Sequence, residues 1–261
     1  GEIDGYSLVL SPAMIGVSNI LGLLTADGSR DEVEVMDEIG SHGGVTASAA
    51  YSNGIYALVG EYTTHEELLD LTSFFRKIES IEKTEVHQTI GPIGTQMELS
   101  RMHLRVLKPL LHEPRLSVVA VSKKSGLTAR RVRRLLNQLE ESGAVRFQAL
   151  LELGAANSIP FLARVTWDEK IANYQEIWDW IVKTYPLSHW QTFVSATEPV
   201  LYSLIAMESL VEVNEVTRAL RKNEKINSVK ALISKYHKFY PSTTRLKLVE
   251  MIEEAYPDPP D

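Results

Sequence analysis

Three segments between residues 98 and 143 carry apolar residues at helical spacing. In Glu98–Leu111 the apolar positions fall mostly on one face, as in a half-buried helix (Met102, Leu104, Val106, Leu107, Leu110 and Leu111). The segments Val118–Ser125 and Thr128–Ser142 repeat this pattern, and the apolar face of the third is formed by Val132, Leu135, Leu136 and Leu139. The pattern therefore predicts three consecutive helices, with Pro109 kinking or shortening the end of the first.

Residues at the helix boundaries predict how these helices connect. Ser117 and Thr128 are polar residues that can cap the second and third helix by accepting backbone N–H bonds. Gly126 and Gly143 follow the ends of these helices, where glycine readily adopts a left-handed backbone. Ser125–Thr128 is then the tight turn of a helix-turn-helix motif. The extended run after Gly143, up to residue 151, is expected to form a wing.

Residues 18–90 follow a pattern of alternating strands and helices. The expected elements are strands at 18–25, 45–51, 55–61 and 81–90 and helices at 30–42 and 65–77. Asn53-Gly54 is a strong signal for a hairpin turn, and Thr64 with Glu67 forms the capping box of the second helix. The order strand–helix–strand–strand–helix–strand predicts a ferredoxin-like sandwich of one sheet and two helices.

The same pattern recurs between Phe161 and about Lys238. At an offset of 142 positions Val35 and Ile39 fall on Ile177 and Ile181, and the offset becomes 146 at the middle hairpin and 145 at the last strand. A duplicated unit explains a period that persists over four consecutive elements. The expected fold class is α+β, with two ferredoxin-like domains flanking a winged helix-turn-helix domain.

These patterns divide the chain into five parts. We expect a remnant wing or linker at 1–15, a first sandwich at 16–92, the winged helix-turn-helix domain at 96–153, a second sandwich at 158–240, and a C-terminal helix with a tail at 241–261. Because Gly1 corresponds to Gly143 in the duplication, a first set of DNA-binding helices is expected to have been lost or removed upstream. The helix Ser242–Tyr256 is expected to pack on the second sandwich, and the residues after it to be disordered.

Charge is distributed unevenly along the chain. The formal net charge is −7, yet residues 101–134 contain ten Lys or Arg residues and a single acid, Glu113. A basic face on an acidic body is the electrostatic footprint expected of a DNA-binding protein. A solvated surface helix is the alternative explanation for such a run of charge.

The third helix carries the residues that are expected to meet DNA. Arg130, Arg131 and Arg134 project from the side opposite its apolar face, near the end that enters the major groove in this motif. Most of these contacts are expected to go to phosphates. The full set of expected DNA-binding residues is Arg115, Ser117, Lys123, Lys124, Thr128, Arg130, Arg131, Arg134 and Arg146.

From Leu99 to Gly143 the chain resembles the Lrp/AsnC family of bacterial and archaeal transcription regulators. The resemblance rests on Arg115-Leu116-Ser117, on Gly126-Leu127-Thr128, and on Leu139-Glu140 followed by Gly143, whereas Ser100 and Pro109 depart from the family pattern. It implies sequence-specific binding of double-stranded DNA by an archaeal-type tandem form, in which both sandwiches are RAM-like domains. It also implies a homodimer or higher oligomer assembled through these domains, which can pair within one chain as two subunits do in simpler members.

The resemblance further implies a small-molecule effector, which RAM domains commonly hold at the subunit interface. The family's Gly-x-x-Asp segment is absent from both repeats. The first has Asn53-Gly54-Ile55-Tyr56 and the second has Glu198-Pro199-Val200-Leu201. No effector-binding residue is therefore assigned, and the effector is left open as absent or as different from an amino acid.

Patterns of catalytic and metal-binding residues are missing from the sequence. The chain has no cysteine, its seven histidines lack metal-ligand spacing, and no phosphate-binding loop, dinucleotide fingerprint or nucleophile elbow is present. We therefore expect a protein that is not an enzyme and that needs no metal or cofactor. No apolar run approaches the roughly 20 residues of a membrane span, so a cytoplasmic protein without a membrane partner is expected.

Two alternatives come from other classes of function. Siroheme decarboxylases pair a similar winged helix with a RAM-like domain, but the segment His112–Ser117 follows the regulator pattern and the arginine cluster has no use in that chemistry. A sensor or partner-binding module without a role at DNA is the second alternative.

Overall fold

The computed structural model describes residues 2–91, 94–152 and 158–257 and divides into two compact units. The repeat unit contains residues 18–91 and 158–240, and the helical unit contains residues 3–17, 94–152 and 241–257. The prediction of a disordered tail concerns mainly residues 258–261, which lie outside the described residues.

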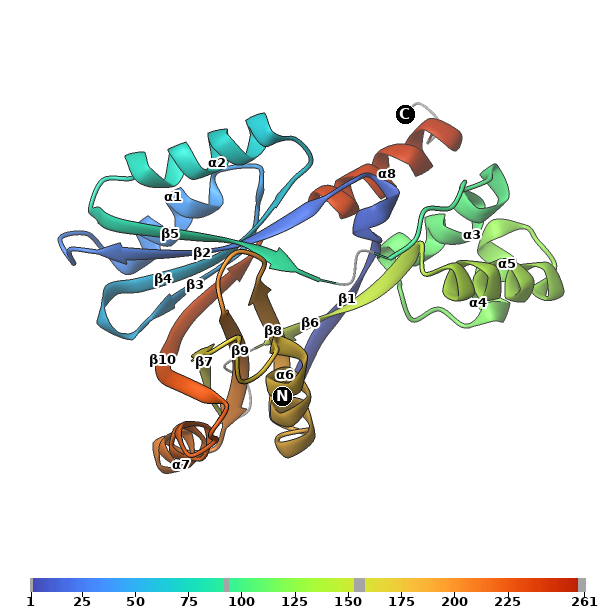
Figure 1. Cartoon of the computed structure of the whole chain (residues 1–261). Helices are drawn as coiled ribbons and strands as arrows, with labels where there is room; N and C mark the ends of the chain where they lie inside the picture. Colours follow the sequence, from blue (N-terminus) through green and yellow to red (C-terminus); the bar gives the residue numbers. More distant parts are fainter. Residues whose placement is uncertain (1, 92–93, 153–157, 258–261) are drawn as a thin grey trace. The chain divides into compact units, whose positions relative to one another are not determined.

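In the repeat unit, both halves show the element order βαββαβ (Figure 1). The first half consists of β2 (Ser18–Ala26), α1 (Glu32–Gly40), β3 (Val45–Tyr51), β4 (Ile55–Tyr62), α2 (His65–Lys77) and β5 (Ile81–Ile90). The second consists of β7 (Ile159–Trp167), α6 (Tyr174–Thr184), β8 (His189–Ser195), β9 (Val200–Met207), α7 (Leu210–Arg221) and β10 (Ile226–Phe239). The strand order is β3-β4-β2-β5 in the first sheet and β8-β9-β7-β10 in the second, and all neighbouring strands are antiparallel.

Local signals explain where several of these elements begin and turn. The expected capping box is present at α2, where Thr64 accepts from the Glu67 N–H and the Glu67 side chain accepts in return. The hairpin between β3 and β4 turns at Asn53 and Gly54, which both have positive φ values, of 64° and 65°. Asparagine and glycine adopt this conformation more easily than other residues, so the turn is encoded locally.

The two sheets join edge to edge into one closed barrel, so the repeats are not separate domains. At one junction the end of β5 pairs with β8, where Thr89 lies opposite Ser195. At the other junction the second half of β10 pairs with β3, where Phe239 lies opposite Ala47. This differs from the predicted boundaries, which divide the repeats into two domains, because pairings between residues more than 100 positions apart leave no local trace in the sequence.

Each sheet buries both of its faces, because successive side chains along a strand point to opposite sides. The outer faces pack against the helices, with Ile20 and Phe75 in the first core and Phe161 and Leu220 in the second. The inner faces share a third core inside the barrel, which includes Leu21, Leu23, Tyr51, Ala57, Leu162, Val200, Tyr202 and Leu232.

The burial of strand residues corrects the repeat offset at the middle hairpin. Tyr56 and Leu201 both face helices, whereas their neighbours Ala57 and Tyr202 both face the barrel interior. The structural offset is therefore 145 here, and the expected 146 is wrong by one position. A slip of one residue matters because it exchanges the two faces of a strand.

The helical unit contains three consecutive helices, a two-stranded sheet and the C-terminal helix. Its elements are β1 (Glu2–Leu10), a 3-10 turn at Pro12–Met14, α3 (Arg101–His112), α4 (Val118–Ser125), α5 (Ala129–Ser142), β6 (Val145–Glu152) and α8 (Thr243–Ala255). The wing strand β6 pairs with β1, and Leu8 and Leu10 of β1 are fully buried in the core of this unit. Strand β1 is thus the second strand of the wing.

The C-terminal helix α8 packs against α3, so the prediction that it packs on the second sandwich is wrong. Leu248 and Ile252 are buried in the core of the helical unit. Arg245 donates to the backbone oxygens of Leu8 and Leu111 over 2.9 and 2.7 Å. The apolar stripe of α8 predicts that one face is buried, but nothing in such a stripe specifies the partner.

Candidate nucleic-acid interface

The turn between α4 and α5 is held by a small set of hydrogen bonds. Gly126 has a φ of 67°, the left-handed conformation that ends α4. The Nε of Arg105 on α3 donates to the carbonyl oxygen of Ser125 over 2.7 Å, and the Ser122 hydroxyl donates to the Leu127 oxygen over 2.5 Å. The first bond satisfies a carbonyl that the C-terminal end of α4 leaves without a partner, and the second ties α4 to the turn that leads into α5.

Helix α5 separates an apolar face from a strongly basic one. Val132, Leu135 and Leu139 are buried against α3 and α4. The helix begins at Thr128, whose hydroxyl accepts from the Arg131 N–H over 3.3 Å. Its exposed basic side chains are Arg130, Arg131, Arg133 and Arg134.

Some basic residues of this region stabilise the helical unit itself. Arg101 and Lys108 donate to the backbone oxygens of Ala255 and Tyr256 over 2.7 and 2.9 Å, at the C-terminal end of α8. Cations at that end interact favourably with the helix dipole. Together with Arg105 at the α4 turn, three of the ten cations in residues 101–134 therefore have structural roles.

Two further cations pair with neighbouring side chains. The Arg115 guanidinium lies over the Tyr6 ring, 4.3 Å from its centre, and donates to the Tyr6 hydroxyl over 2.8 Å. Lys124 forms an ion pair with Glu113, the one acid in the basic segment. Arg115 remains exposed, and its stacking on β1 holds it in a defined direction.

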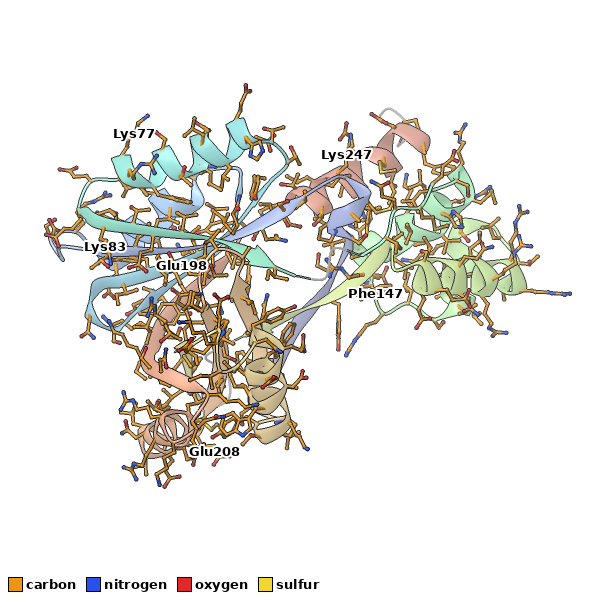
Figure 2. All side chains as sticks on the ribbon, viewed as in Figure 1. Lys77, Lys83, Phe147, Glu198, Glu208 and Lys247 are labelled. Carbon is orange, nitrogen blue, oxygen red and sulfur yellow. The ribbon has the colours of Figure 1, made fainter. Side chains whose placement is uncertain are left out.

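The predicted DNA-binding residues are placed as follows. Ser117 and Thr128 are exposed helix caps, Lys123 is exposed on α4, and Arg146 is half-buried on the wing strand β6. Sequence reasoning left out Arg133, although it is exposed on α5, and Tyr6, which positions Arg115. It also left out Phe147, which projects from β6 with 52% of its surface exposed (Figure 2).

In the part of the chain that the structure describes, five cations of the segment carry no hydrogen bond or ion pair from the side chain. They are Lys123, Arg130, Arg131, Arg133 and Arg134, from α4 and α5. Clustered positive charge without acidic partners raises the local potential and attracts a polyanion.

A second group of polar side chains is buried in the repeat unit. The Nε of Arg164 lies 3.2 Å from the Tyr202 hydroxyl, which is 3.0 Å from Nε2 of His87. Nδ1 of His87 lies 3.2 Å from the Ser195 hydroxyl. These residues come from β7, β9, β5 and β8, so the chain of bonds links both repeats where β5 meets β8.

The other junction of the barrel has no such group among the described residues. Strand pairing and side-chain direction give the equivalent residues there. His87 corresponds to Leu232 and Tyr202 to Ala57. Arg164 corresponds to Leu23 and Ser195 to Tyr51. All four counterparts belong to the barrel's apolar core. The histidines were tested in the sequence only for metal-ligand spacing, which gives no indication of the buried hydrogen bonds of His87, a residue that is 4% exposed.

The described residues contain no group of three or more His, Asp or Glu side chains arranged to hold a metal ion. Among the same residues, no helix is long and apolar enough to cross a membrane.

Comparison with protein families confirms the winged helix-turn-helix. Residues 99–146 match the family described as "Winged helix-turn-helix DNA-binding". The match covers α3, α4, α5 and the start of β6, which is the segment with the cation cluster. The chain is therefore a mixed α/β protein with a winged helix-turn-helix domain. No curated protein matches it.

Solved structures share the fold over different lengths of the chain. The siroheme decarboxylase NirDL is 12% identical, with a TM-score of 0.58, over 97% of this chain and 84% of its own. Its co-complex with an iron-uroporphyrin III analogue gives a TM-score of 0.60 over 98% of this chain, at 12% identity and 84% of its own chain. A transcriptional regulator of Neisseria meningitidis in complex with L-Met is 20% identical over 56% of this chain and 96% of its own, with a TM-score of 0.45.

The first of these comparisons overturns one expectation. The prediction that the chain is not an enzyme is wrong as an exclusion, because an enzyme shares the fold over nearly the whole chain. The prediction rested on missing sequence motifs, and such motifs identify only the chemistries that use them.

Proposed function

We propose that this protein is a transcription regulator of the Lrp/AsnC type that binds specific sequences of double-stranded DNA, with α5 in the major groove. The observation that supports this most is the group of five exposed cations on α4 and α5, which have no side-chain partner among the described residues. Phosphates would supply the missing counter-charge, while arginines near the start of α5 would reach the edges of bases.

The neighbouring elements fit this role. Arg115 is held on Tyr6 in a fixed direction, so it is suited to position the domain on the phosphate backbone. Arg146 and Phe147 project from the wing strand, which follows α5 directly. Ser117 and Thr128 cap their helices, and the exposed N-termini of α4 and α5 would favour phosphate binding.

The repeat unit is proposed to consist of two RAM-like, ferredoxin-like halves that serve in oligomerisation and in sensing a small-molecule effector. Pairing of the halves within one barrel supports an arrangement in which one chain takes the place of two subunits. A homodimer would then present two winged helices to a two-fold symmetric operator.

Selection from random DNA sequences with the purified chain tests this function. A DNA-binding regulator should enrich one defined motif, and a homodimer should enrich an inverted repeat of it. Half-sites should be separated by one helical turn of about 10 base pairs or a multiple of it. If DNA is recovered only at low salt and no motif is enriched, the binding is non-specific attraction between charges. That result would contradict the proposal.

A second candidate function is a siroheme decarboxylase-like activity. It is favoured by the full-length fold similarity to NirDL together with the buried group of His87, Tyr202 and Arg164, which is confined to one barrel junction. A histidine, a phenol and a guanidinium can between them bind a carboxylate and move a proton. Anaerobic incubation with siroheme, followed by absorbance and by mass spectrometry of the tetrapyrrole, tests this candidate. A loss of 44 mass units per carboxyl group (about the mass of CO₂) would support it, and unchanged siroheme would exclude it.

A further inference from the structure

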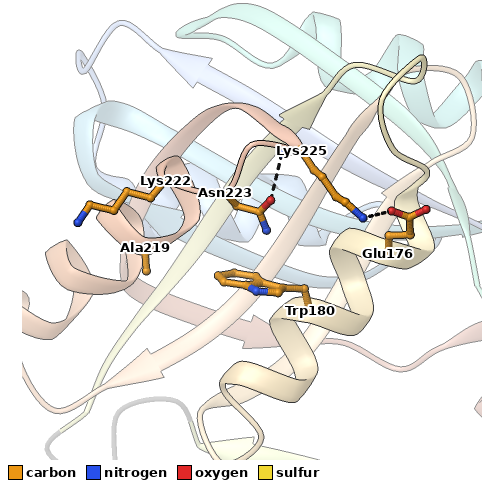
Figure 3. Close-up of a pocket in the computed structure, with 6 residues that line it drawn as sticks. All are labelled: Glu176, Trp180, Ala219, Lys222, Asn223 and Lys225. Atoms are coloured by element: carbon orange, nitrogen blue, oxygen red, sulfur yellow. Dashed lines mark hydrogen bonds and ion pairs between the residues drawn. The ribbon is translucent and has the colours of Figure 1, made fainter.

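A cavity of about 400 Å³ lies between α6 and α7 in the second repeat (Figure 3). Its lining consists of Glu176, Trp180, Ala219, Lys222, Asn223 and Lys225. The volume falls within the range of small-molecule pockets, roughly 300–1,000 Å³. Neither the DNA-binding surface nor the buried group at His87 contributes a residue to it.

The cavity lies where the two repeats differ, and the first difference is on α7. Leu71 and Phe75 of α2 are buried like Val216 and Leu220 of α7, which sets the offset between these helices at 145. Phe74 of the first repeat therefore corresponds to Ala219. The Phe74 ring packs against the rings of His42 and Phe75, with centroids 5.1 and 5.8 Å apart, whereas a single methyl group stands in its place in the second repeat. The first repeat thus fills a groove that the second leaves open.

Two other lining residues also replace side chains of a different character. Asn223 corresponds to Ile78, which is buried in the first repeat, and Trp180 on α6 corresponds to Glu38 on α1. The second repeat therefore carries an indole and an amide where the first carries a carboxylate and an apolar side chain. These changes convert a packed groove into one with an aromatic wall and a polar end.

The hydrogen bonds around Asn223 fix which groups face the cavity. Its side-chain oxygen accepts from the Lys225 N–H over 3.0 Å, so its amide nitrogen is turned toward Trp180 (Figure 3). Lys225 forms an ion pair with Glu176 and is neutralised by it. Lys222 at the rim has no ion pair within the described part of the chain. The cavity therefore offers an aromatic face, N–H donors in a fixed position and one uncompensated positive charge.

We propose that this cavity binds a small planar aromatic carboxylate. The ring of the ligand would stack on Trp180 beside Ala219, in the space that Phe74 occupies in the first repeat. The carboxylate would accept from the Asn223 amide, and the flexible Lys222 side chain would bring its ammonium group to the same carboxylate. The proposal does not depend on DNA binding or on decarboxylation, because all the contacts are made inside the second repeat.

The test uses the full chain without DNA and 4-fluorobenzoate as the probe, with 4-fluorobenzamide as its uncharged counterpart. Fluorine NMR titrations should show saturable binding of the carboxylate and weaker binding of the amide. Ala219→Phe, which installs the side chain of the first repeat, should weaken carboxylate binding by at least about tenfold. Lys222→Ala should weaken it as well, whereas Lys77→Ala at the equivalent position of the first repeat should leave it unchanged.

Three results would overturn the proposal. They are no saturable binding of 4-fluorobenzoate at millimolar concentration, equal binding of the uncharged amide, or wild-type binding by both Ala219→Phe and Lys222→Ala. Asn223→Ile, which also restores a residue of the first repeat, provides the decisive comparison if Ala219→Phe does not fold. Circular dichroism establishes folding for each variant before titration.

Discussion

His87 on β5 and Tyr202 on β9 are joined by a hydrogen bond of 3.0 Å between Nε2 and the phenolic oxygen. The bond crosses from one repeat to the other, and both side chains are almost completely buried. A neutral imidazole needs one donor and one acceptor around it, and Ser195 with Tyr202 can supply both. A protonated imidazole needs two acceptors, but the Ser195 hydroxyl oxygen already accepts from the N–H groups of Thr197 and Glu198.

This arrangement predicts how the stability of the fold depends on pH. Burial lowers the pKa of His87 below its ordinary value of 6.5. The nearby carboxylates of Glu198 and Glu85 raise this pKa, and the charge of Arg164 lowers it, but burial has the largest effect. As the pH falls through 6.5, the unfolded chain takes up a proton that the folded chain does not. The free energy of unfolding should therefore decrease with falling pH in this window and increase again as the pH rises.

Urea unfolding at several pH values between 5 and 8 measures this effect. His87→Leu installs the residue of the other junction, Leu232, and should flatten the dependence. A smaller slope should remain, because burial also lowers the pKa of His189. His65→Gln replaces an exposed histidine outside this hydrogen-bonded group and serves as the control for the substitution itself. If His87→Leu leaves the slope unchanged, the histidine is not the group that titrates.

Gly40 at the end of α1 predicts a second effect on the stability of the fold, and this one is purely steric. A Cβ at this position would overlap the ring of Tyr240, whose hydroxyl is bonded to Ser48 and to the Met36 carbonyl over 3.0 and 3.1 Å. Because these bonds hold the ring, Gly40→Ala should destabilise the protein by about 1–3 kcal/mol despite the better helix propensity of alanine.

Thermal or urea unfolding of two variants checks this prediction. Gly43→Ala is the matched control, since nothing lies within 4 Å of a Cβ built there. It should change stability little. A Gly40→Ala variant as stable as the wild type would show that Tyr240 moves aside without loss.

Tyr6 and Arg115 predict a specific change in DNA binding. Arg115→Ala should weaken binding to all sequences and reduce the slope of log K against log salt by about one, the effect of one phosphate contact. Tyr6→Ala should weaken binding less, because Arg115 would keep its charge but lose its fixed direction. Fluorescence anisotropy over a salt series distinguishes the two variants. A wild-type affinity for Tyr6→Ala would show that the stacking does not position Arg115 for DNA.

The sequence predicts the helix-turn-helix closely because the signals for its boundaries are local. The expected helix at 118–125 coincides with α4, and Thr128 and Gly143 cap α5 as expected. Each of these signals lies within four residues of the helix end that it determines. Pro109 does not shorten the first helix, since α3 continues to His112.

Features that depend on distant contacts were not predictable in the same way. The apolar periodicity of β5 and β8 shows that they are strands, but not that Thr89 lies opposite Ser195. The packing of α8 against α3 could not be predicted from the sequence for the same reason. The polar group at His87 could have been detected only by comparing the repeats at the right offset, where His87 falls on Leu232 and Tyr202 on Ala57.

The sequence predicts that the candidate DNA surface is positively charged. It does not predict which of its cations have structural partners. Arg101, Arg105 and Lys108 carry the same positive charge as Arg130, yet they bond to backbone oxygens inside the helical unit. The partners of Arg101 and Lys108 lie at the end of α8, more than 100 residues further along the chain, whereas Arg105 bonds to the Ser125 carbonyl at the end of α4. Only the structure separates structural cations from those available to a ligand.

The role of α5 as the DNA-binding helix is tested by measuring duplex DNA binding of a variant with Arg130, Arg131 and Arg134 all changed to alanine. The measurement is anisotropy over a salt series on a duplex obtained by selection, or on a mixed-sequence duplex. A variant with Lys77, Lys170 and Lys183 changed to alanine removes the same charge from exposed sites of the repeat unit. We expect the arginine variant to fold normally, to lose specific binding and to have a salt slope lower by about three, while the lysine variant binds like the wild type. An arginine variant with unchanged affinity and salt slope would contradict the assignment of α5 as the DNA-binding helix.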